Sequence, residues 1–488
     1  MTILALDAGT TSTRAMLFGA DGAVLARAQR PFAQHFPRDG WVEHDADEIW
    51  RETLACARDV VSSQATPAAI GIAVQRETVV VWDRATGAPV HRAIVWQDRR
   101  TAAQCDALAA SAEAMALVAR TGLLLDPYFS ATKLAWILDH VAGARERAER
   151  GELLAGTIDS WLLWKLTGGR VHATDATNAS RTLLFDIRRL AWDDELCALF
   201  RVPRAMLPEV RDSAGDFGVS AAGWFGREIP IAAMVGDQQA AAVGQECIAA
   251  GQAKATYGTG CFVLVHTGDA PRVSRHRLLT TIALQLRGRA TYALEGSIFN
   301  AGTVVQWLRD RLGVITTAHE TAALAASVSS TGGVCFVPAF TGLGAPWWNP
   351  AARGTITGLT RDTGRAELVR AALESVSFQT RDLATAFRDD GVPITALRVD
   401  GGMAANDWLM QDLANQLRVV VERPAVLETT AWGAARLAGM QVGLYPPLGE
   451  DGVRRVERTF KPAGGEARDD ERYVAWLAAV ARATATAS

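Results

Sequence analysis

The sequence predicts an α/β protein made of two halves of similar design with a cleft between them. Two strand-turn-strand segments carry the same kind of glycine-threonine turn, one at residues 4–18 and the other at residues 255–265. The chain of 488 residues also exceeds the size at which one hydrophobic core stops growing, which favours two domains of about 200 to 250 residues each. Strands and helices follow each turn in a similar order, so the halves indicate an internal duplication with a hinge near residues 247–254.

In the first half, the opening turn belongs to a predicted three-stranded meander whose third strand includes residues 24–26. A helix from about residue 45 to 62 follows, with an aspartate cap at its start and apolar residues at helical spacing. A strand at residues 70–74 and a hairpin between residues 79–82 and 93–96 come next. Long helices rich in alanine and leucine complete this half.

The second half repeats this order around the second turn. Its most informative segment is a strand that ends in Gly401-Gly402 and leads into a helix, because such a turn is a ready site for an anion or a nucleotide. The elements expected here are helices at about 237–250, 300–312, 365–388 and 406–417, strands at 255–267 (a hairpin), 291–295 and 396–400, and a last amphipathic helix around Tyr473 and Trp476.

Composition is typical of a globular enzyme, with 49% apolar and 21% charged residues. A net charge of -3 without a block of basic residues argues against a nucleic-acid partner and favours small molecules. The six cysteines form no CxxC pair and are expected to be buried free thiols of a reducing compartment. Because the sequence shows neither signal-peptide features nor about 20 consecutive apolar residues, we expect a cytoplasmic protein without a transmembrane segment.

The chemistry of the two turns suits phosphate. Glycine lets the backbone approach a ligand closely, while successive N–H groups and threonine or serine hydroxyls converge on the bound group. Each turn alone is also consistent with a simple hairpin closure, but two facing turns would hold a polyphosphate from both sides. Phosphoryl transfer from ATP needs such donors, a metal anchor and an aligned base. Asp7, before the first turn, can orient Mg²⁺ through water or can be an ordinary turn residue.

Asp237 is the candidate base, because it follows a predicted strand and opens an apolar helix. The alternative is a helix N-cap, which contributes typically about 1 kcal/mol, and the two roles are compatible.

Polar and aromatic side chains gather after two predicted strands and before a predicted helix. A polyol needs donors and acceptors for its hydroxyls and a flat apolar face for its C–H edge, and these side chains supply both. Taken singly, Arg76 and Glu77 are typical of a surface ion pair, and Trp96 is typical of a core residue. The three clusters are residues 75–77, 96–100 and 126–130.

Other chemistry has little support. The chain has no GxxxxGK[ST] loop, no HExxH helix and no GxSxG elbow, and its eight histidines form no cluster with ligand spacing. We therefore do not expect an enzyme whose metal ion is bound tightly by several protein side chains.

Dense motifs along almost the whole chain resemble the FGGY carbohydrate kinase family and, within it, the glycerol kinases. The resemblance implies two actin-like, ribonuclease-H-like domains, at residues 1–247 and 253–488, with the active site in the cleft between them. It also implies phosphorylation of glycerol to sn-glycerol 3-phosphate with ATP and Mg²⁺, in glycerol catabolism, by a homo-oligomer (a dimer or tetramer). The matching segments are residues 5–14, 40–45, 75–78, 94–101, 126–133, 236–239, 257–262, 338–348, 399–402 and 406.

The resemblance also implies roles for individual residues. Asp237 would take the proton from the hydroxyl that attacks the γ-phosphate, and Asp7 would serve Mg²⁺. Glycerol would be surrounded by Arg76, Glu77, Trp96, Tyr128, Asp237, Gln238 and Phe262. The nucleotide would be bound by Thr10, Thr11, Ser12, Arg14, Thr259, Gly302, Gln306, Gly402 and Asn406.

The sequence departs from the family pattern in a few places. Ala8 replaces the usual Gln and Ala131 the usual Gly, both at the rims of motifs. Residues 223–228 lack the loop that binds fructose 1,6-bisphosphate in some bacterial members, and the histidine phosphorylated in others is also missing. Two alternatives stay open: a kinase of another small polyol or a ketose, and an actin- or chaperone-like ATPase switch.

Overall fold

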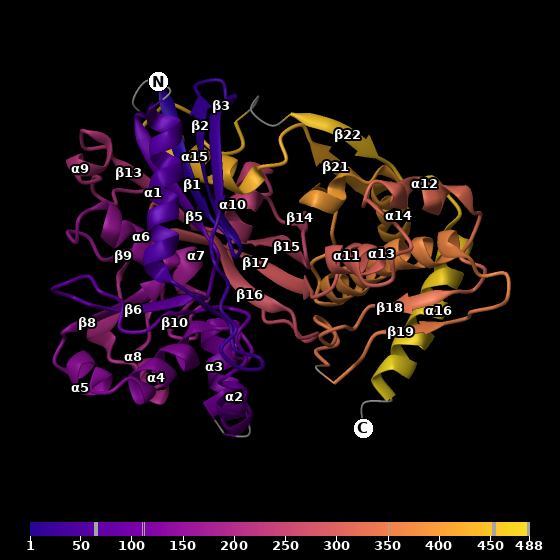
Figure 1. Cartoon of the computed structure of the whole chain (residues 1–488), viewed down its shortest axis with the longest axis horizontal. Helices are drawn as coiled ribbons and strands as arrows, with labels where there is room; N and C mark the ends of the chain where they lie inside the picture. The colour runs from indigo at the N-terminus through magenta and orange to yellow at the C-terminus, as the bar shows by residue number, and fades with distance from the viewer. Residues whose placement is uncertain (63–66, 110, 112, 350, 451–454, 486–488) are drawn as a thin grey trace.

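The computed structural model describes residues 1–488 except for residues 63–66, 110, 112, 350, 451–454 and 486–488. Two large β-sheets form its framework, one in each half of the chain (Figure 1). The first consists, in spatial order, of β3 (Val24–Pro31), β2 (Ser12–Gly19), β1 (Thr2–Ala8), β5 (Ala69–Val74) and β13 (Ile231–Gly236). The second consists of β16 (Leu279–Leu286), β17 (Arg289–Ile298), β15 (Cys261–Gly268), β14 (Gln252–Tyr257), β20 (Ala396–Asp400), β21 (Val420–Pro424) and β22 (Val456–Phe460).

Helices and short strands surround these sheets. The first half contains β4 (Glu43–His44), α1 (Ala46–Ser62), β6 (Val79–Asp83), β7 (Ala93–Ile94), α2 (Ala102–Ala109), α3 (Glu113–Thr121), α4 (Ser130–His140), α5 (Ala144–Glu149), β8 (Leu153–Thr157), α6 (Ile158–Leu166), β9 (Ala173–Asp175), α7 (Ala176–Ala179), β10 (Phe185–Asp186), β11 (Ala191–Trp192), α8 (Asp194–Leu199), a 3-10 turn (Arg204–Met206), β12 (Glu209–Arg211), α9 (Ala222–Phe225) and α10 (Asp237–Gly244). The second half contains α11 (Gly302–Asp310), α12 (Glu320–Ser327), β18 (Cys335–Val337), β19 (Thr355–Thr357), α13 (Arg365–Asp389), a 3-10 turn (Gly402–Ala405), α14 (Asp407–Leu417), α15 (Thr429–Gln441) and α16 (Glu466–Ala485).

Each large sheet has the same internal order. Strands β1, β2 and β3 pair antiparallel, and β5 and β13 then extend the sheet in parallel beside β1. In the second half, β14, β15 and β17 pair antiparallel, and β20 and β21 extend the sheet in parallel beside β14. The α/β class, the opening meander and the second hairpin are therefore confirmed, and the repeated order supports an internal duplication.

Two expected elements differ in detail. The helix predicted to reach residue 250 ends at Gly244, because Glu246 adopts φ 56° and Arg398 Nη1 donates to the carbonyl oxygens of Gln245 and Glu246 at 2.7 and 2.6 Å. The hairpin of β6 and β7 pairs only at Val79 and Ile94, since β6 takes most of its ladder from β8.

The aspartate expected to cap α1 is Asp45. Its Oδ1 accepts hydrogen bonds from the N–H groups of Asp47 and Glu48 at 2.9 and 3.1 Å. This satisfies two N–H groups at the start of the helix that have no partner within it.

Helices α10 and α15 join the two halves by packing directly against each other. A Cβ atom on Gly433 of α15 would lie 1.8 Å from the carbonyl oxygen of Ala240 on α10, and one on Gly244 would lie 2.1 Å from that of Thr429. Helix α15 also lies on β5 of the first sheet, where a Cβ on Gly71 would lie 2.3 Å from the Ala434 oxygen. The halves therefore meet through backbone, with glycine at the points of contact.

All six cysteines are free thiols, as expected, and five are buried while Cys335 is partly exposed. Among the described residues, no helix is long and apolar enough to cross a membrane.

The helix contact predicts that Gly433→Ala destabilises the protein. The added methyl group would clash with backbone that cannot rotate away, and overpacking of this kind typically costs about 1–3 kcal/mol or more. Thermal unfolding should show a lower Tm for Gly433→Ala than for the parent protein. The control is Gly223→Ala in α9, where a new Cβ meets nothing within 4 Å, and equal Tm values for the two variants would contradict the prediction.

Candidate functional site

Strand β5 is followed by a tight turn that brings Arg76 and Glu77 into one buried cluster. Glu77 has φ 63°, and the N–H of Thr78 donates to the carbonyl oxygen of Arg76 at 2.8 Å. A hydrogen bond across one residue with positive φ defines a γ-turn, which is rare and strained. Neighbouring side chains of an extended strand point to opposite faces, so this turn is what allows both side chains to enter the same site.

The Arg76 and Glu77 side chains are each 2% exposed, so the surface ion pair interpretation is wrong. Arg76 Nη1 lies 2.5 Å from Glu295 Oε2, and Glu295 Oε1 accepts from Arg181 Nη2 at 2.8 Å. Arg181 Nε donates to Glu77 Oε1 at 2.5 Å, and the remaining gap, from Glu77 Oε1 to Arg76 Nε, is 3.9 Å. We call these four side chains the four-charge ring.

Asp237 is the first residue of α10 and lies beside this ring. Its Oδ1 is 3.4 Å from Arg76 Nε, and the side chain is 25% exposed. The N-cap position of α10 belongs to Gly236, but Asp237 Oδ1 accepts the helix N–H of Gln238 at 2.7 Å, so the carboxylate still satisfies one N–H group at the start of the helix. Burial raises the pKa of Asp237, while the charges of Arg76 and Lys254 oppose that rise. Lys254 Nζ, also buried, donates to Gln238 Oε1.

Asp7 ends β1 directly before the first turn. It is buried and stands opposite Arg14 in the register of β1 and β2, with Arg14 Nη1 3.8 Å from Asp7 Oδ2. Burial raises the pKa of Asp7 to about 6; the Arg14 charge acts against this rise and the Asp237 charge adds to it. The structure therefore brings both predicted carboxylates into one electrostatic environment.

The first turn carries three residues that are predicted to bind the nucleotide. Thr10 Oγ1 accepts a hydrogen bond from Trp96 Nε1 at 3.0 Å, and Ser12 Oγ accepts one from Gln29 Nε2 at 2.9 Å. Thr11 is exposed. The hydroxyl of Thr10 is therefore hydrogen-bonded to Trp96, which is predicted to contact glycerol.

Trp96, Tyr128 and Phe262 form one aromatic group. The ring of Trp96 meets Tyr128 edge-on at a centroid distance of 5.5 Å and Phe262 at 6.0 Å. Trp96 is only partly buried, so the core interpretation does not describe it fully. Because Phe262 follows the second turn by two residues and Trp96 contacts the first turn, this group connects the two turns.

The second turn lies against the start of α11. The carbonyl oxygen of Thr259 accepts the N–H of Ala301 at 3.0 Å, and a Cβ on Gly302 would lie 2.4 Å from the Gly258 oxygen. Only glycine fits at this contact without a shift of the backbone. Thr259 is exposed at the tip, and Gln306 is exposed one turn further along α11.

The turn after β20 completes this side of the site. Gly401 has φ 87°, and its Cβ would lie 2.5 Å from the Tyr257 oxygen at the end of β14, so the turn is in contact with the second turn. Gly402 is exposed. Asn406 caps α14, with Oδ1 accepting from the Leu409 N–H at 3.0 Å. The predicted nucleotide residues of the second half therefore lie at the adjoining ends of β14 and β20 and at the starts of α11 and α14.

Lys133 supports the segment that carries Tyr128. Its buried Nζ donates to the carbonyl oxygens of Pro127 and Tyr128 at 3.2 and 2.6 Å. Burial lowers the pKa of Lys133 to about 7, although nearby carboxylates oppose this shift. The amine thus fixes the backbone at Tyr128.

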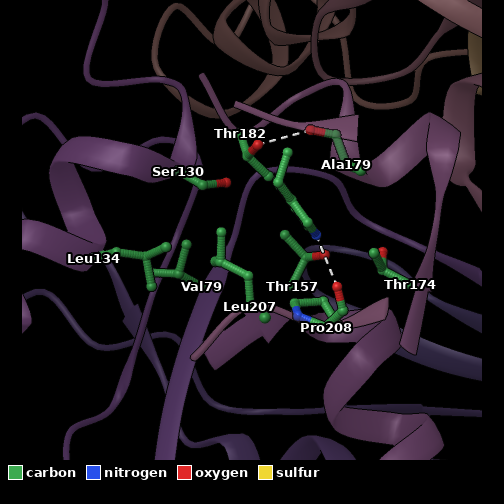
Figure 2. Close-up of a pocket in the computed structure, with 11 residues that line it drawn as sticks. Val79, Ser130, Leu134, Thr157, Thr174, Ala179, Thr182, Leu207 and Pro208 are labelled. Carbon is green, nitrogen blue, oxygen red and sulfur yellow. Dashed lines mark hydrogen bonds between the residues drawn. The ribbon is translucent and has the colours of Figure 1, made fainter. Parts of the chain in front are cut away.

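A small cavity is lined by Val79, Ser130 and Thr182, among other residues (Figure 2). Ser130 Oγ donates to the Glu77 carbonyl oxygen at 3.1 Å. The volume of about 10 Å³ is close to that of one water position, so this cavity is too small for glycerol or a nucleotide.

Sequence reasoning missed Arg181, Glu295, Lys254 and Lys133. A signal existed for two of them, because Lys254 lies between two alanines and Glu295 between Leu294 and Gly296 within strands, where charged residues are seldom buried without a partner. Among the described residues, no group of three or more histidine, cysteine or acidic side chains could hold a metal ion.

Two family models cover most of the chain. The N-terminal domain of the FGGY family of carbohydrate kinases matches residues 2–244, and its C-terminal domain matches residues 253–442. The chain belongs to the FGGY family of carbohydrate kinases.

Relatives and solved structures agree with this assignment. A glycerol kinase of Rhodospirillum centenum is 59% identical to this FGGY kinase over 98% of the chain and 97% of the relative. The crystal structure of Plasmodium falciparum glycerol kinase with ADP superposes with a TM-score of 0.94 at 34% identity, covering 99% of this chain and 98% of that one. A ligand-bound xylulose kinase of Lactobacillus acidophilus gives a TM-score of 0.90 at 22% identity, with both chains fully covered, and shows the shared fold alone.

The buried amine of Lys133 predicts a specific pH dependence of stability. Its folded pKa of about 7 lies below its unfolded value, so only the unfolded state holds this proton between the two values. The free energy of unfolding should therefore rise with pH in this interval relative to Lys133→Met, by at most about 1.4 kcal/mol per pH unit. Denaturant unfolding at several pH values from 7 to about 9.5 measures the difference.

The matched control is Lys461→Met, which removes an exposed lysine. A difference between the parent protein and Lys133→Met that stays constant or falls with pH would overturn the prediction.

Proposed function

We propose that this FGGY kinase transfers the γ-phosphoryl group of ATP to glycerol and forms sn-glycerol 3-phosphate, as glycerol catabolism requires. The observation that carries the proposal is the buried pair of Arg76 and Glu77 together with the aromatic group of Trp96, Tyr128 and Phe262. Glycerol needs donors and acceptors for its hydroxyls and an apolar face for its C–H edge. The 59% identity to a relative named glycerol kinase supports the same substrate.

In this proposal, Arg76 donates to glycerol hydroxyls, Glu77 accepts from them, and Gln238 completes the polar contacts. A glycerol hydroxyl attacks the γ-phosphoryl group and displaces ADP, and Asp237 takes the proton of that hydroxyl. Its carboxylate is suitably placed for this step because it lies 3.4 Å from the guanidinium of Arg76. Positioning and charge stabilisation provide most of the acceleration in such reactions.

The two turns and the segments beside them would bind ATP. Thr11 and Thr259 are exposed at the turn tips, and hydroxyls in glycine turns of this kind are suited to phosphate oxygens. The nucleotide residues in this proposal are Thr10, Thr11, Ser12, Arg14, Thr259, Gly302, Gln306, Gly402 and Asn406. The Plasmodium falciparum glycerol kinase, whose crystal structure contains ADP, supports this proposal.

We propose that Asp7 serves Mg²⁺. A single buried carboxylate beside a phosphate-binding turn fits this ion, which usually keeps several waters and binds through one or two carboxylates plus substrate phosphates. When bound, Mg²⁺ would neutralise charge on the phosphate oxygens.

The alternatives have weaker support. The similarity to a xylulose kinase is at 22% identity and concerns the fold, whereas the glycerol kinase relative matches at 59% over almost the whole chain. An ATPase switch of the actin or chaperone type has no need for a buried arginine-glutamate pair beside an aromatic group. We also propose that the enzyme is cytoplasmic and that it forms a homo-oligomer. Sedimentation velocity measures the oligomeric state.

Replacement of Asp237 by asparagine should lower kcat by about 10²- to 10⁴-fold, because a positioned base usually contributes that much. ATP binding should stay close to normal, since Asp237 acts on the acceptor. Coupled measurement of ADP and sn-glycerol 3-phosphate formation gives kcat, and nucleotide titration gives the affinity.

The control for this variant is Asp106→Asn, which neutralises an exposed carboxylate on α2. Near-normal turnover of Asp237→Asn would remove Asp237 from the base role. Preferred turnover of a pentulose in a panel of polyols and sugars, or ATP hydrolysis without phosphorylated product, would replace the glycerol assignment.

The raised pKa of Asp237 predicts the acid limb of the pH profile. A general base must be ionised, so kcat/KM for glycerol should fall as the pH drops through the pKa of Asp237 in the free enzyme. Because burial raises that pKa, the midpoint should lie above about 4, the usual value of an exposed aspartate. Initial rates from pH 4.5 to 8, with the enzyme's stability checked by return to pH 7.5, test this. A profile flat to pH 4.5 would contradict it.

A further inference from the structure

We propose that Arg181 and Glu295 are positioning residues of the glycerol site, which hold Arg76 and Glu77 in place and make that site depend on both halves of the chain. This inference rests on the proposed function, because it concerns how the glycerol-binding pair is oriented. Neither residue is expected to touch glycerol.

The contacts of the four-charge ring orient both members of the pair. Glu295 binds Arg76 Nη1 at 2.5 Å and Arg181 Nη2 at 2.8 Å through different carboxylate oxygens. Arg181 in turn binds Glu77 Oε1 through Nε at 2.5 Å. Arg76 and Glu77, the two residues proposed to bind glycerol, are therefore each held by a partner of opposite charge. All four side chains are at most 2% exposed.

Glu295 brings the second half of the chain into this site. It lies on β17, opposite Leu264 of β15, and Ser297 of the same strand lies opposite Phe262. Residues two apart on a strand share a face, so Glu295 is on the same face of the second sheet as Phe262. One sheet face thus supplies both the aromatic ring and the carboxylate that meet residues of the first half.

Arg181 has a second function in the same place. Its guanidinium carbon lies 5.6 Å from the ring centroid of Tyr128 and 5.3 Å from that of Phe129. Arg181 therefore contacts two predicted glycerol residues, Glu77 through a charge-assisted hydrogen bond and Tyr128 through its ring.

The charges explain why removal of either positioning residue would matter. Burial raises the pKa of Glu77, and the charge of Arg181 is the largest effect that opposes this rise. Without Arg181, Glu77 would tend to be neutral and would lose acceptor capacity for a hydroxyl. Glu295 touches both arginines, which hold its pKa at about 2, so it stays ionised and keeps Arg76 in place.

The test is steady-state kinetics and thermal unfolding of Glu295→Asp, Arg181→Gln and the double variant Arg181→Gln/Glu295→Gln. Glu295→Asp keeps the charge balance of the ring but shortens the side chain by one methylene, so the carboxylate cannot reach both arginines. The double variant removes one charge of each sign. Both are designed to fold, because neither leaves an uncompensated buried charge.

We expect each variant to raise the KM for glycerol by about tenfold or more, with the KM for ATP changed less than about threefold. The double variant should recover Tm relative to Arg181→Gln while its glycerol KM stays high. A purely structural role predicts the opposite pattern, in which Tm falls and glycerol KM is unchanged, and that result would overturn the inference.

The control is Glu374→Gln, which removes the charge of a buried glutamate in the second half that pairs with the partly exposed Arg472 at 2.6 Å, and this variant should lower Tm without raising glycerol KM. Failure of the proposed function can be distinguished from failure of this inference, because the parent enzyme would then form no sn-glycerol 3-phosphate. Glycerol turnover by the parent enzyme with an unchanged KM in Glu295→Asp would reject the positioning role alone.

Discussion

The backbone contact between α10 and α15 is the constraint on which the rest of the structure depends. Glycine at positions 244 and 433 allows the two helices to approach until no side chain separates them. Helix α10 begins with Asp237, and α15 lies on the first sheet, so the same contact sets both the spacing of the halves and the location of the proposed base. A site assembled from two sheets needs such a fixed distance, because hydrogen bonds tolerate displacements of only a few tenths of an ångström.

The four-charge ring depends on this fixed distance between the two halves. Four buried charges without partners would strongly destabilise the fold, whereas two pairs that share contacts balance one another. The ring closes only when Glu295, from the second sheet, reaches Arg76 and Arg181 of the first half. The polar part of the proposed glycerol site is consequently a property of the assembled molecule, although its binding residues belong to one half.

Much of the framework could be predicted from the sequence, because it depends on local patterns. The two glycine-threonine turns, the strands around them and the strand before Asp237 follow from alternation and turn chemistry, and the family motifs led to the proposed site roles. The ring could not be predicted in this way, since Arg76 and Glu295 are 219 residues apart and Glu77 and Arg181 are 104 apart. The end of α10 could not be predicted either, because the arginine that binds the two carbonyl groups directly after the helix comes from β20.

The γ-turn at Glu77 limits how this enzyme can change its substrate in evolution. In the proposed function, two adjacent codons specify the donor and the acceptor for a polyol, so a few base changes would be enough to alter the recognition chemistry. The backbone at position 77, however, has a φ of 63°, which glycine adopts with ease and most other residues avoid. Most replacements with a different hydrogen-bonding pattern would strain the turn or straighten it, and a straightened chain would turn one of the two side chains away from the site. New specificity at this position therefore requires a simultaneous change in the backbone, which is a larger step than a point mutation.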